Sequence, residues 1–124
     1  MRPSPILASI ALLFATGCHS AYIDTTLRNR TGHPITLVEL DYPSASFGTQ
    51  TLNPGQDFHY RFKVLGSGDL KLLYTDQGSP DPNTQDPHTT GPHLQEGDEG
   101  TLLVSVTPTG TQWTPILHNR SSHQ

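Results

Sequence analysis

The segment Phe58–Val64 most constrains how this chain folds, because apolar and polar side chains alternate through it without interruption. Its apolar positions are Phe58, Tyr60, Phe62 and Val64, and its polar positions are His59, Arg61 and Lys63. Successive side chains of a β-strand point to opposite faces, so this period of two predicts a strand with one face on a core and the other in water.

Alternation and turn residues continue along the chain, and no stretch of ten residues repeats at helical spacing. The predicted strands are Tyr22–Arg28, Ile35–Tyr42, Phe47–Leu52, Phe58–Val64, Leu70–Thr75, Thr101–Thr107 and Thr111–His118. The apolar residues of the second strand change parity, which predicts a β-bulge near Leu37 or Val38. Gly66–Asp69 is expected to close a hairpin between the fourth and fifth strands, and this hairpin to form the centre of the core.

Seven short strands in about 100 residues predict an all-β fold. We expect a small antiparallel β-sandwich of immunoglobulin-like size, with a partly open β-barrel as the alternative. The domain should cover residues 22–118, followed by a flexible tail at 119–124. The chain has a single cysteine, so an internal disulfide is excluded.

The N-terminal segment has the layout of a secretory signal peptide. Arg2 precedes an apolar run from Ile6 to Phe14, and small residues follow at Ala15 and Gly17. The run is shorter than the ~20 apolar residues of a membrane-spanning helix. We therefore expect residues 1–17 to be removed on export.

Phe14-Ala15-Thr16-Gly17-Cys18 resembles the lipobox of bacterial lipoproteins, with Ala15 where that family prefers leucine. The resemblance implies that the Cys18 thiol carries diacylglycerol, that its amino group is N-acylated, and that residues 18–21 tether the domain to a membrane. His19 stands where inner-membrane lipoproteins often have aspartate, which favours the outer membrane of the bacterial envelope. A secreted protein with a free Cys18 is the alternative.

The charge balance excludes some classes of partner. The whole chain has a formal net charge of −4, which loss of Arg2 with the signal peptide lowers further. Anionic nucleic acids and polybasic membrane contacts both require the opposite balance. The expected partners are the membrane, through the lipid anchor, and another envelope protein, while the oligomeric state stays open.

Residues 76–100 interrupt the strand pattern with four prolines, four glycines and one aliphatic residue, Leu94. They predict a long loop, and loops of this length are often functional. Its candidate partner-facing residues are Asp76, Gly78, Asp81, Asn83, His88 and His93.

The same loop contains candidate metal ligands. His88, His93, Asp81 and Asp86 supply nitrogen and oxygen donors suited to zinc or copper, although their spacing matches no established zinc pattern. Residues 76–78 and 97–100 offer oxygen ligands for calcium without the spacing of an EF-hand. A polar loop that binds no metal is the plainer interpretation.

The short tether predicts an orientation. Three residues separate Cys18 from the first predicted strand, a reach of about 10–14 Å. If successive strands reverse direction, the turns at 30–34 and 53–56 and the loop 76–100 lie far from the membrane. The turns at 43–45, 66–69 and 108–110 then face lipid.

No nucleophile with a neighbouring base, paired catalytic carboxylates or phosphate-binding glycine loop stands out in the sequence. We therefore expect a lipid-anchored, non-catalytic envelope protein that acts as a structural or protein-interaction module through its distal loops. The alternatives are a small-ligand or metal-binding lipoprotein that uses residues 76–100, and an enzyme of a kind that these motifs do not identify.

Overall fold

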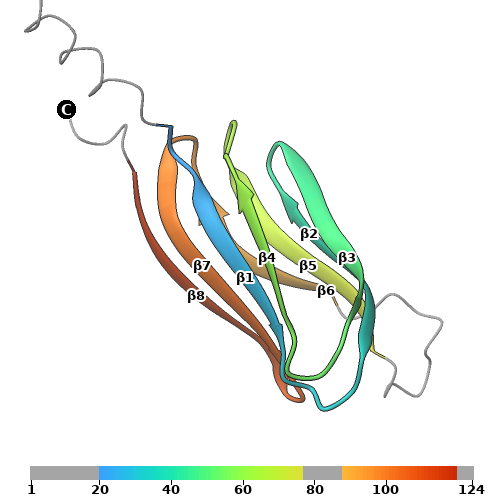
Figure 1. The fold of residues 1–124 in the computed structure, drawn as a ribbon. Coiled ribbons are helices and arrows are strands. Elements are labelled where there is room, and N and C mark those ends of the chain that lie inside the picture. Colours follow the sequence, from blue (N-terminus) through green and yellow to red (C-terminus); the bar gives the residue numbers. More distant parts are fainter. Residues whose placement is uncertain (1–19, 77–87, 120–124) are drawn as a thin grey trace, which may run out of the picture.

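The computed structural model describes residues 20–76 and 88–119, which fold into two β-sheets packed face to face (Figure 1). The strands are β1 Ile23–Asn29, β2 Ile35–Tyr42, β3 Ala45–Leu52, β4 Asp57–Phe62, β5 Gly68–Asp76, β6 His88–Leu94, β7 Asp98–Thr107 and β8 Gly110–Asn119. One sheet has the order β4-β1-β7-β8 and the other β3-β2-β5-β6. The predicted all-β sandwich is confirmed, with eight described strands in place of seven.

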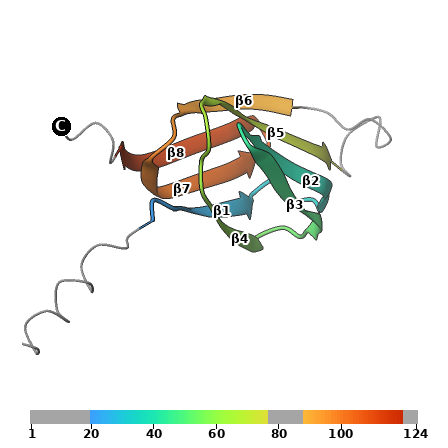
Figure 2. The ribbon, with the colours of Figure 1, turned by 90° about the horizontal axis from the view of Figure 1, so that it is seen from above.

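Neighbouring strands are antiparallel except β1 and β7, which run in parallel with Ile23 beside Gly100 and Asn29 beside Val106. Figure 2 shows the two layers from above, with β6 over β8 at one side and β3 approaching β4 at the other. Neither sheet closes on itself, so the described strands form a sandwich and not a barrel.

The core lies between the sheets and is built from alternate residues of each strand. Along β1, for example, Ile23 and Leu27 are buried and Asp24 is exposed. The buried apolar side chains are Ile23, Leu27, Ile35, Val38, Leu40, Phe47, Leu52, Phe62, Val64, Leu70, Leu72, Tyr74, Leu94, Leu102, Val104 and Val106. They come from both sheets, as a sandwich core requires.

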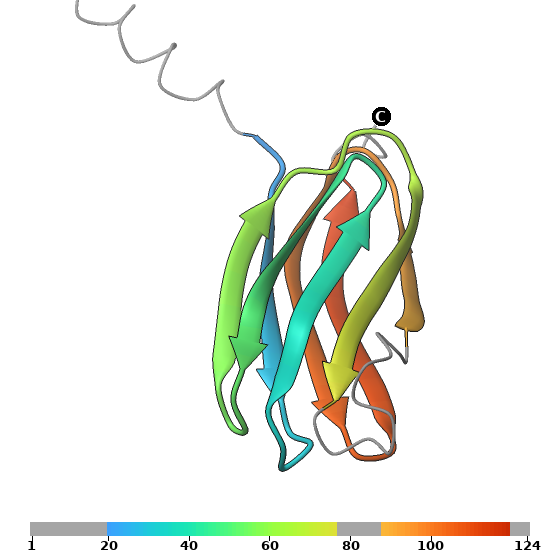
Figure 3. The ribbon, with the colours of Figure 1, turned by 90° about the vertical axis from the view of Figure 1, so that its right-hand side faces the viewer.

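The sandwich has two ends, which we name from β1. The entry end is where β1 begins at Ile23, and the far end is where β1 finishes at Asn29 (Figure 3). The register places the connections at 30–34, 53–56 and 108–110 at the far end. The connections at 43–44, 63–67 and 95–97 lie at the entry end.

The predicted position of residues 108–110 is therefore wrong. They lie at the far end because β7 runs parallel to β1 and finishes beside it. The error follows from the predicted loop 76–100, which omitted β6. One additional strand reverses the direction of every strand after it.

The predicted loop is wrong in its second half. β6 pairs with β5, and β7 begins at Asp98, so the residues between β6 and β7 reduce to a turn at 95–97. Pro92 and Gly91 are tolerated because β6 is the edge strand of its sheet. Gly91 is also required sterically, since a Cβ there would lie 2.6 Å from the Trp113 ring of β8.

The predicted hairpin at Gly66–Asp69 is also wrong. β4 pairs with β1 in one sheet, whereas β5 pairs with β2 and β6 in the other, so residues 63–67 cross between the sheets. β4 is thus an edge strand. Its Tyr60 is 42% exposed, although it lies on the same face of the strand as the buried Phe62. Strand β5 does supply core residues, among them Leu70 and Leu72.

The predicted bulge is confirmed. The register between β2 and β5 shifts between Thr36 and Glu39, and Leu37 takes a φ of 51°. The bulge turns Leu37 outward, where it is 51% exposed, and lets Val38 and Leu40 join Ile35 in the core.

Candidate functional site

Several residues predicted as sites lie outside the described part of the chain. These are Cys18, Gly78, Asp81, Asn83 and Asp86. Of the others, Asp76 ends β5, and His88 and His93 belong to β6. Of the predicted partner-facing set, the three described residues therefore lie on the strand pair β5–β6.

The structure does not bring His88 and His93 together. Their register partners on β5 are Leu73 and Asp69, four residues apart, which corresponds to about 13 Å along a strand. His93 Nδ1 lies 2.8 Å from Asp69 Oδ1 on an exposed face. Within residues 20–76 and 88–119, no cluster of three or more His, Cys, Asp or Glu side chains could hold a metal ion.

The far end is organised by a buried asparagine, Asn29. Its side-chain amide donates hydrogen bonds to the carbonyl oxygens of His33 at 2.7 Å and Leu52 at 2.8 Å. Its Oδ1 accepts from the backbone N–H of Thr31 at 2.9 Å and from the Thr31 hydroxyl at 2.7 Å. A fully enclosed amide with all these partners fixes the backbone around it.

Backbone hydrogen bonds join the two far-end turns at the same residue. Gly55 N–H donates to the Asn29 carbonyl at 2.7 Å, and Asn29 N–H donates to the Gln56 carbonyl at 3.2 Å. The turn at 30–34 is therefore fastened to the turn at 53–56 by both the side chain and the main chain of one residue. We call these two joined turns the far-end platform.

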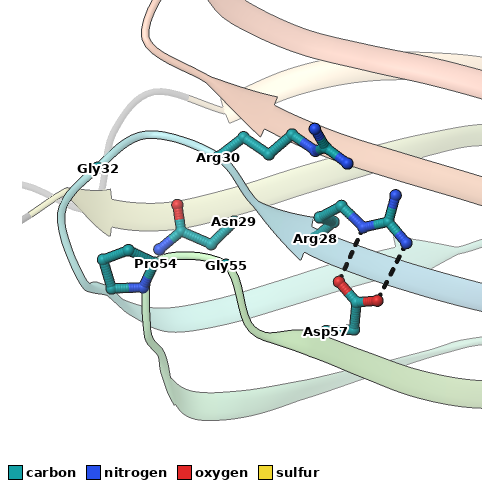
Figure 4. A pocket seen from close by; sticks show the side chains of 7 residues that line it. All are labelled: Arg28, Asn29, Arg30, Gly32, Pro54, Gly55 and Asp57. Carbon is teal, nitrogen blue, oxygen red and sulfur yellow. Dashed lines mark hydrogen bonds and ion pairs between the residues drawn. The ribbon is translucent and has the colours of Figure 1, made fainter.

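Beside this platform Arg28 and Asp57 form a two-pronged ion pair across β1 and β4 (Figure 4). Arg28 donates from Nε to Asp57 Oδ1 at 2.9 Å and from a terminal nitrogen to Asp57 Oδ2 at 3.0 Å. The hydrogen bonds from Arg28 hold the pKa of Asp57 below its usual value, and the positive charge of Arg30 adds a smaller effect in the same direction. This geometry fixes the guanidinium plane of Arg28.

These groups line a surface hollow of about 600 Å³, the far-end hollow. Its lining residues are Arg28, Asn29, Arg30, Gly32, Pro54, Gly55 and Asp57. Arg30 is exposed, and Figure 4 shows its side chain running alongside Arg28, with dashed lines joining only Arg28 and Asp57. Among the described residues, no carboxylate forms an ion pair with Arg30.

A second hollow, of about 560 Å³, lies on the outer face of β2 and β3. Glu39 lines it, and Asp41 follows on the same face of β2. A hydrogen bond between the two carboxyl groups, followed by their mutual repulsion, raises the pKa of Glu39. Asp41 Oδ1 is buried and has no hydrogen-bond partner among the described residues.

Neither the far-end hollow nor the second hollow was predicted from the sequence. Asn29 and Arg30 read as ordinary turn residues, although Asn29 with Thr31 two positions later has the spacing of an Asx turn. That spacing could have indicated the local hydrogen bonds but not the contact with Leu52. Glu39 and Asp41 could have been recognised as neighbours, because residues two apart share one face of a strand.

Two further findings bear on classification. No helix within the described residues is long and apolar enough to cross a membrane. Comparison of the whole chain with protein-family models, with curated proteins and with solved structures gave no significant match.

Proposed function

We propose that the protein is a lipid-anchored, non-catalytic module of a bacterial cell envelope that binds another envelope protein through its far end. The observation that carries this proposal is the position of the far-end hollow. It lies at the end of β1 opposite to the point where the chain arrives from Cys18. A membrane anchor at Cys18 would therefore present the hollow away from lipid.

The charges of the hollow indicate which group of the partner would bind. Arg28 is already held by Asp57, whereas Arg30 is exposed beside it. A carboxylate of the partner could pair with the Arg30 guanidinium, which offers several donors in one plane. Because Asn29 fixes the backbone under Arg30, the contact would require little ordering of the platform.

The anchor is supported by the resemblance of residues 14–18 to a lipobox and by the short path to the domain. Only residues 19–22 separate Cys18 from Ile23, which limits the reach to roughly 17 Å at ~3.5 Å per residue. Mass spectrometry of the N-terminal peptide from natively expressed protein tests the anchor directly. An unmodified Cys18 would remove it from the proposal.

Photo-crosslinking in cells tests the binding end. A crosslinking amino acid at His33, exposed in the far-end turn, should capture a partner, and one at Ser67, exposed at the entry end, should not. Arg30→Glu should abolish the capture, while Lys63→Glu at the entry end serves as the matched charge control. Equal capture from both positions, or capture that survives Arg30→Glu, would contradict the proposal.

Limited proteolysis tests the orientation. A protease site inserted at 108–110 should be cut rapidly when the lipidated protein is reconstituted into liposomes, because this turn lies at the far end. The same site inserted at 95–97 should be cut slowly, because that turn lies at the entry end, which the lipid anchor would hold close to the bilayer. Equal rates in liposomes would contradict the orientation, and equal rates in detergent are the control.

A further inference from the structure

The two sheets formed by the described residues have four edge strands, and three of these carry features that hinder pairing with another chain. β6 contains Pro92 and an irregular register, β8 contains Pro115, and β4 is short and charged. Proline, charge, bulges and shortness are the devices by which proteins protect sheet edges. β3 has none of them, since Ala45–Leu52 is eight residues long and contains no proline and no charged residue.

The inner side of this edge presents aromatic surface. Phe47 of β3 stacks on Tyr60 of β4 with ring centroids 4.2 Å apart. Tyr60 is 42% exposed, although its side chain lies on the core-facing side of β4. A strand added beside β3 could cover this ring with apolar side chains of its own.

The outer side of the same edge presents acid groups. Gly48 of β3 is the register partner of Glu39 on β2. A Cβ there would clash with the Val38 carbonyl of β2, so the position requires glycine and no side chain stands between Glu39 and the edge. With strands about 4.8 Å apart, a residue opposite Gly48 on an added strand would lie about 10 Å from the Glu39 backbone. A lysine or arginine reaching across Gly48 and a glutamate reaching back can span that distance.

The charges around Glu39 and Asp41 allow a cation to approach these two acids from the β3 side. On β5, the register partner of Glu39 is Leu73 and that of Asp41 is Lys71, so the only nearby cation in the described strands lies on the side away from β3. Asp41 Oδ1, buried and without a partner among the described residues, is an acceptor that an incoming cation would complement. The second hollow, lined by Glu39 and Gly48, provides the space.

We propose that β3 is a docking edge for an extended segment of another protein, which adds as a strand with apolar side chains toward Tyr60 and a basic side chain across Gly48 toward Glu39. A second copy of this chain does not fit this description through β3 itself, because Ala45–Leu52 contains no lysine or arginine. The proposal does not depend on the lipid anchor or on the far-end hollow.

The probe is a fluorescent eight-residue peptide of alternating threonine and valine with a central threonine replaced by lysine, compared with the same peptide carrying glutamate. Fluorescence anisotropy with the full chain should show the lysine peptide binding about tenfold more tightly, since exchanging an attractive for a repulsive cross-strand pair changes binding by about that factor. Hydrogen exchange should slow at the amides of β3 and not at those of β6 or β8.

Charge variants of Gln50 separate charge recognition from simple blocking of the edge. Gln50 is exposed on the outer face of β3, two residues from Gly48. Gln50→Glu should tighten binding of the lysine peptide and Gln50→Lys should weaken it, each by several-fold. Thr114→Lys, on the exposed face of β8, is the matched control and should leave binding unchanged.

Several outcomes would overturn the proposal. These are equal affinity for the two peptides, no binding of either at millimolar concentration, and protection at a different edge. If the β3 amides of the protein without peptide exchange slowly, and exchange faster after the protein is diluted, a second copy of the chain occupies the edge instead. Thermal unfolding of each variant verifies that binding is compared between folded proteins.

Discussion

Replacing Asn29 with alanine should destabilise the domain by about 2–4 kcal/mol, because four hydrogen bonds end on this enclosed side chain. Two of the four groups keep a partner in the variant, since the Thr31 hydroxyl lies 2.9 Å from the His33 carbonyl and can donate to it in place of Asn29. The Thr31 N–H and the Leu52 carbonyl lose their partner. Each orphaned buried group costs about 1–2 kcal/mol, which gives the stated range.

The assay is urea unfolding followed by the fluorescence of Trp113, the single tryptophan of the chain. In thermal unfolding the same loss corresponds to a decrease in Tm of roughly 10–20 °C for a domain of this size. Asn53→Ala is the matched control, because Asn53 is exposed in the adjoining turn, and it should change stability by less than about 0.5 kcal/mol. If the two variants lose equal stability, Asn29 does not hold the far end together.

Asn29→Asp adds a test of direction. The new oxygen would face the carbonyl oxygens of His33 and Leu52, which accept hydrogen bonds from the native amide. Burial and this repulsion should raise the pKa of the aspartate above its unfolded value of about 3.9. The stability of the variant should therefore be greatest below that pH and fall as pH rises toward 7. A pH-independent loss would refute the assignment of the amide donors.

Three further variants test other parts of the fold. Arg28 lowers the pKa of Asp57, so the Asp57 carboxylate stabilises the fold at pH values above its unfolded pKa. This stabilisation is lost as pH falls through the folded pKa. Asp57→Asn should therefore lower Tm near pH 7 and not near pH 2. Because Asp41 raises the pKa of Glu39, the contribution of Glu39 to stability should be lost as pH rises past about 4.3. Glu39→Gln should therefore raise Tm relative to the native protein near pH 7 and not near pH 2. Gly91→Ala should cost about 1–3 kcal/mol and shift the Trp113 emission, whereas Thr90→Ala, exposed on the same strand, should do neither.

Alternation was sufficient to locate most strands. β1, β2, β7 and β8 lie within a few residues of their predicted ranges, and the change of parity at Leu37 indicated the bulge. These features are local, because a strand buries alternate residues whichever strand lies beside it. Pairing is not local, and the predicted hairpin between β4 and β5 failed although both strands exist.

The candidate sites were less predictable because they depend on contacts between distant segments. The burial of Asn29 requires the turns at 30–34 and 53–56 to meet, and the alternation within each strand does not contain that information. The spacing of His88 and His93 along β6 is the converse case. His88 and His93 are close in sequence, but an extended strand carries them apart, whereas a loop could have folded them together.

The edge strands connect the main error with the main inference. Pro92 and Gly91 made β6 read as a loop, because proline and glycine interrupt strands in most sequence patterns. In the fold these residues mark an edge: proline removes a backbone donor that pairing with a further strand would use, and glycine makes room for Trp113. The same reasoning applies to Pro115 of β8. A proline inside an alternating segment is therefore evidence for a protected edge as much as against a strand. The β3 edge, which has neither a proline nor a charged residue, is where a partner strand meets the least resistance.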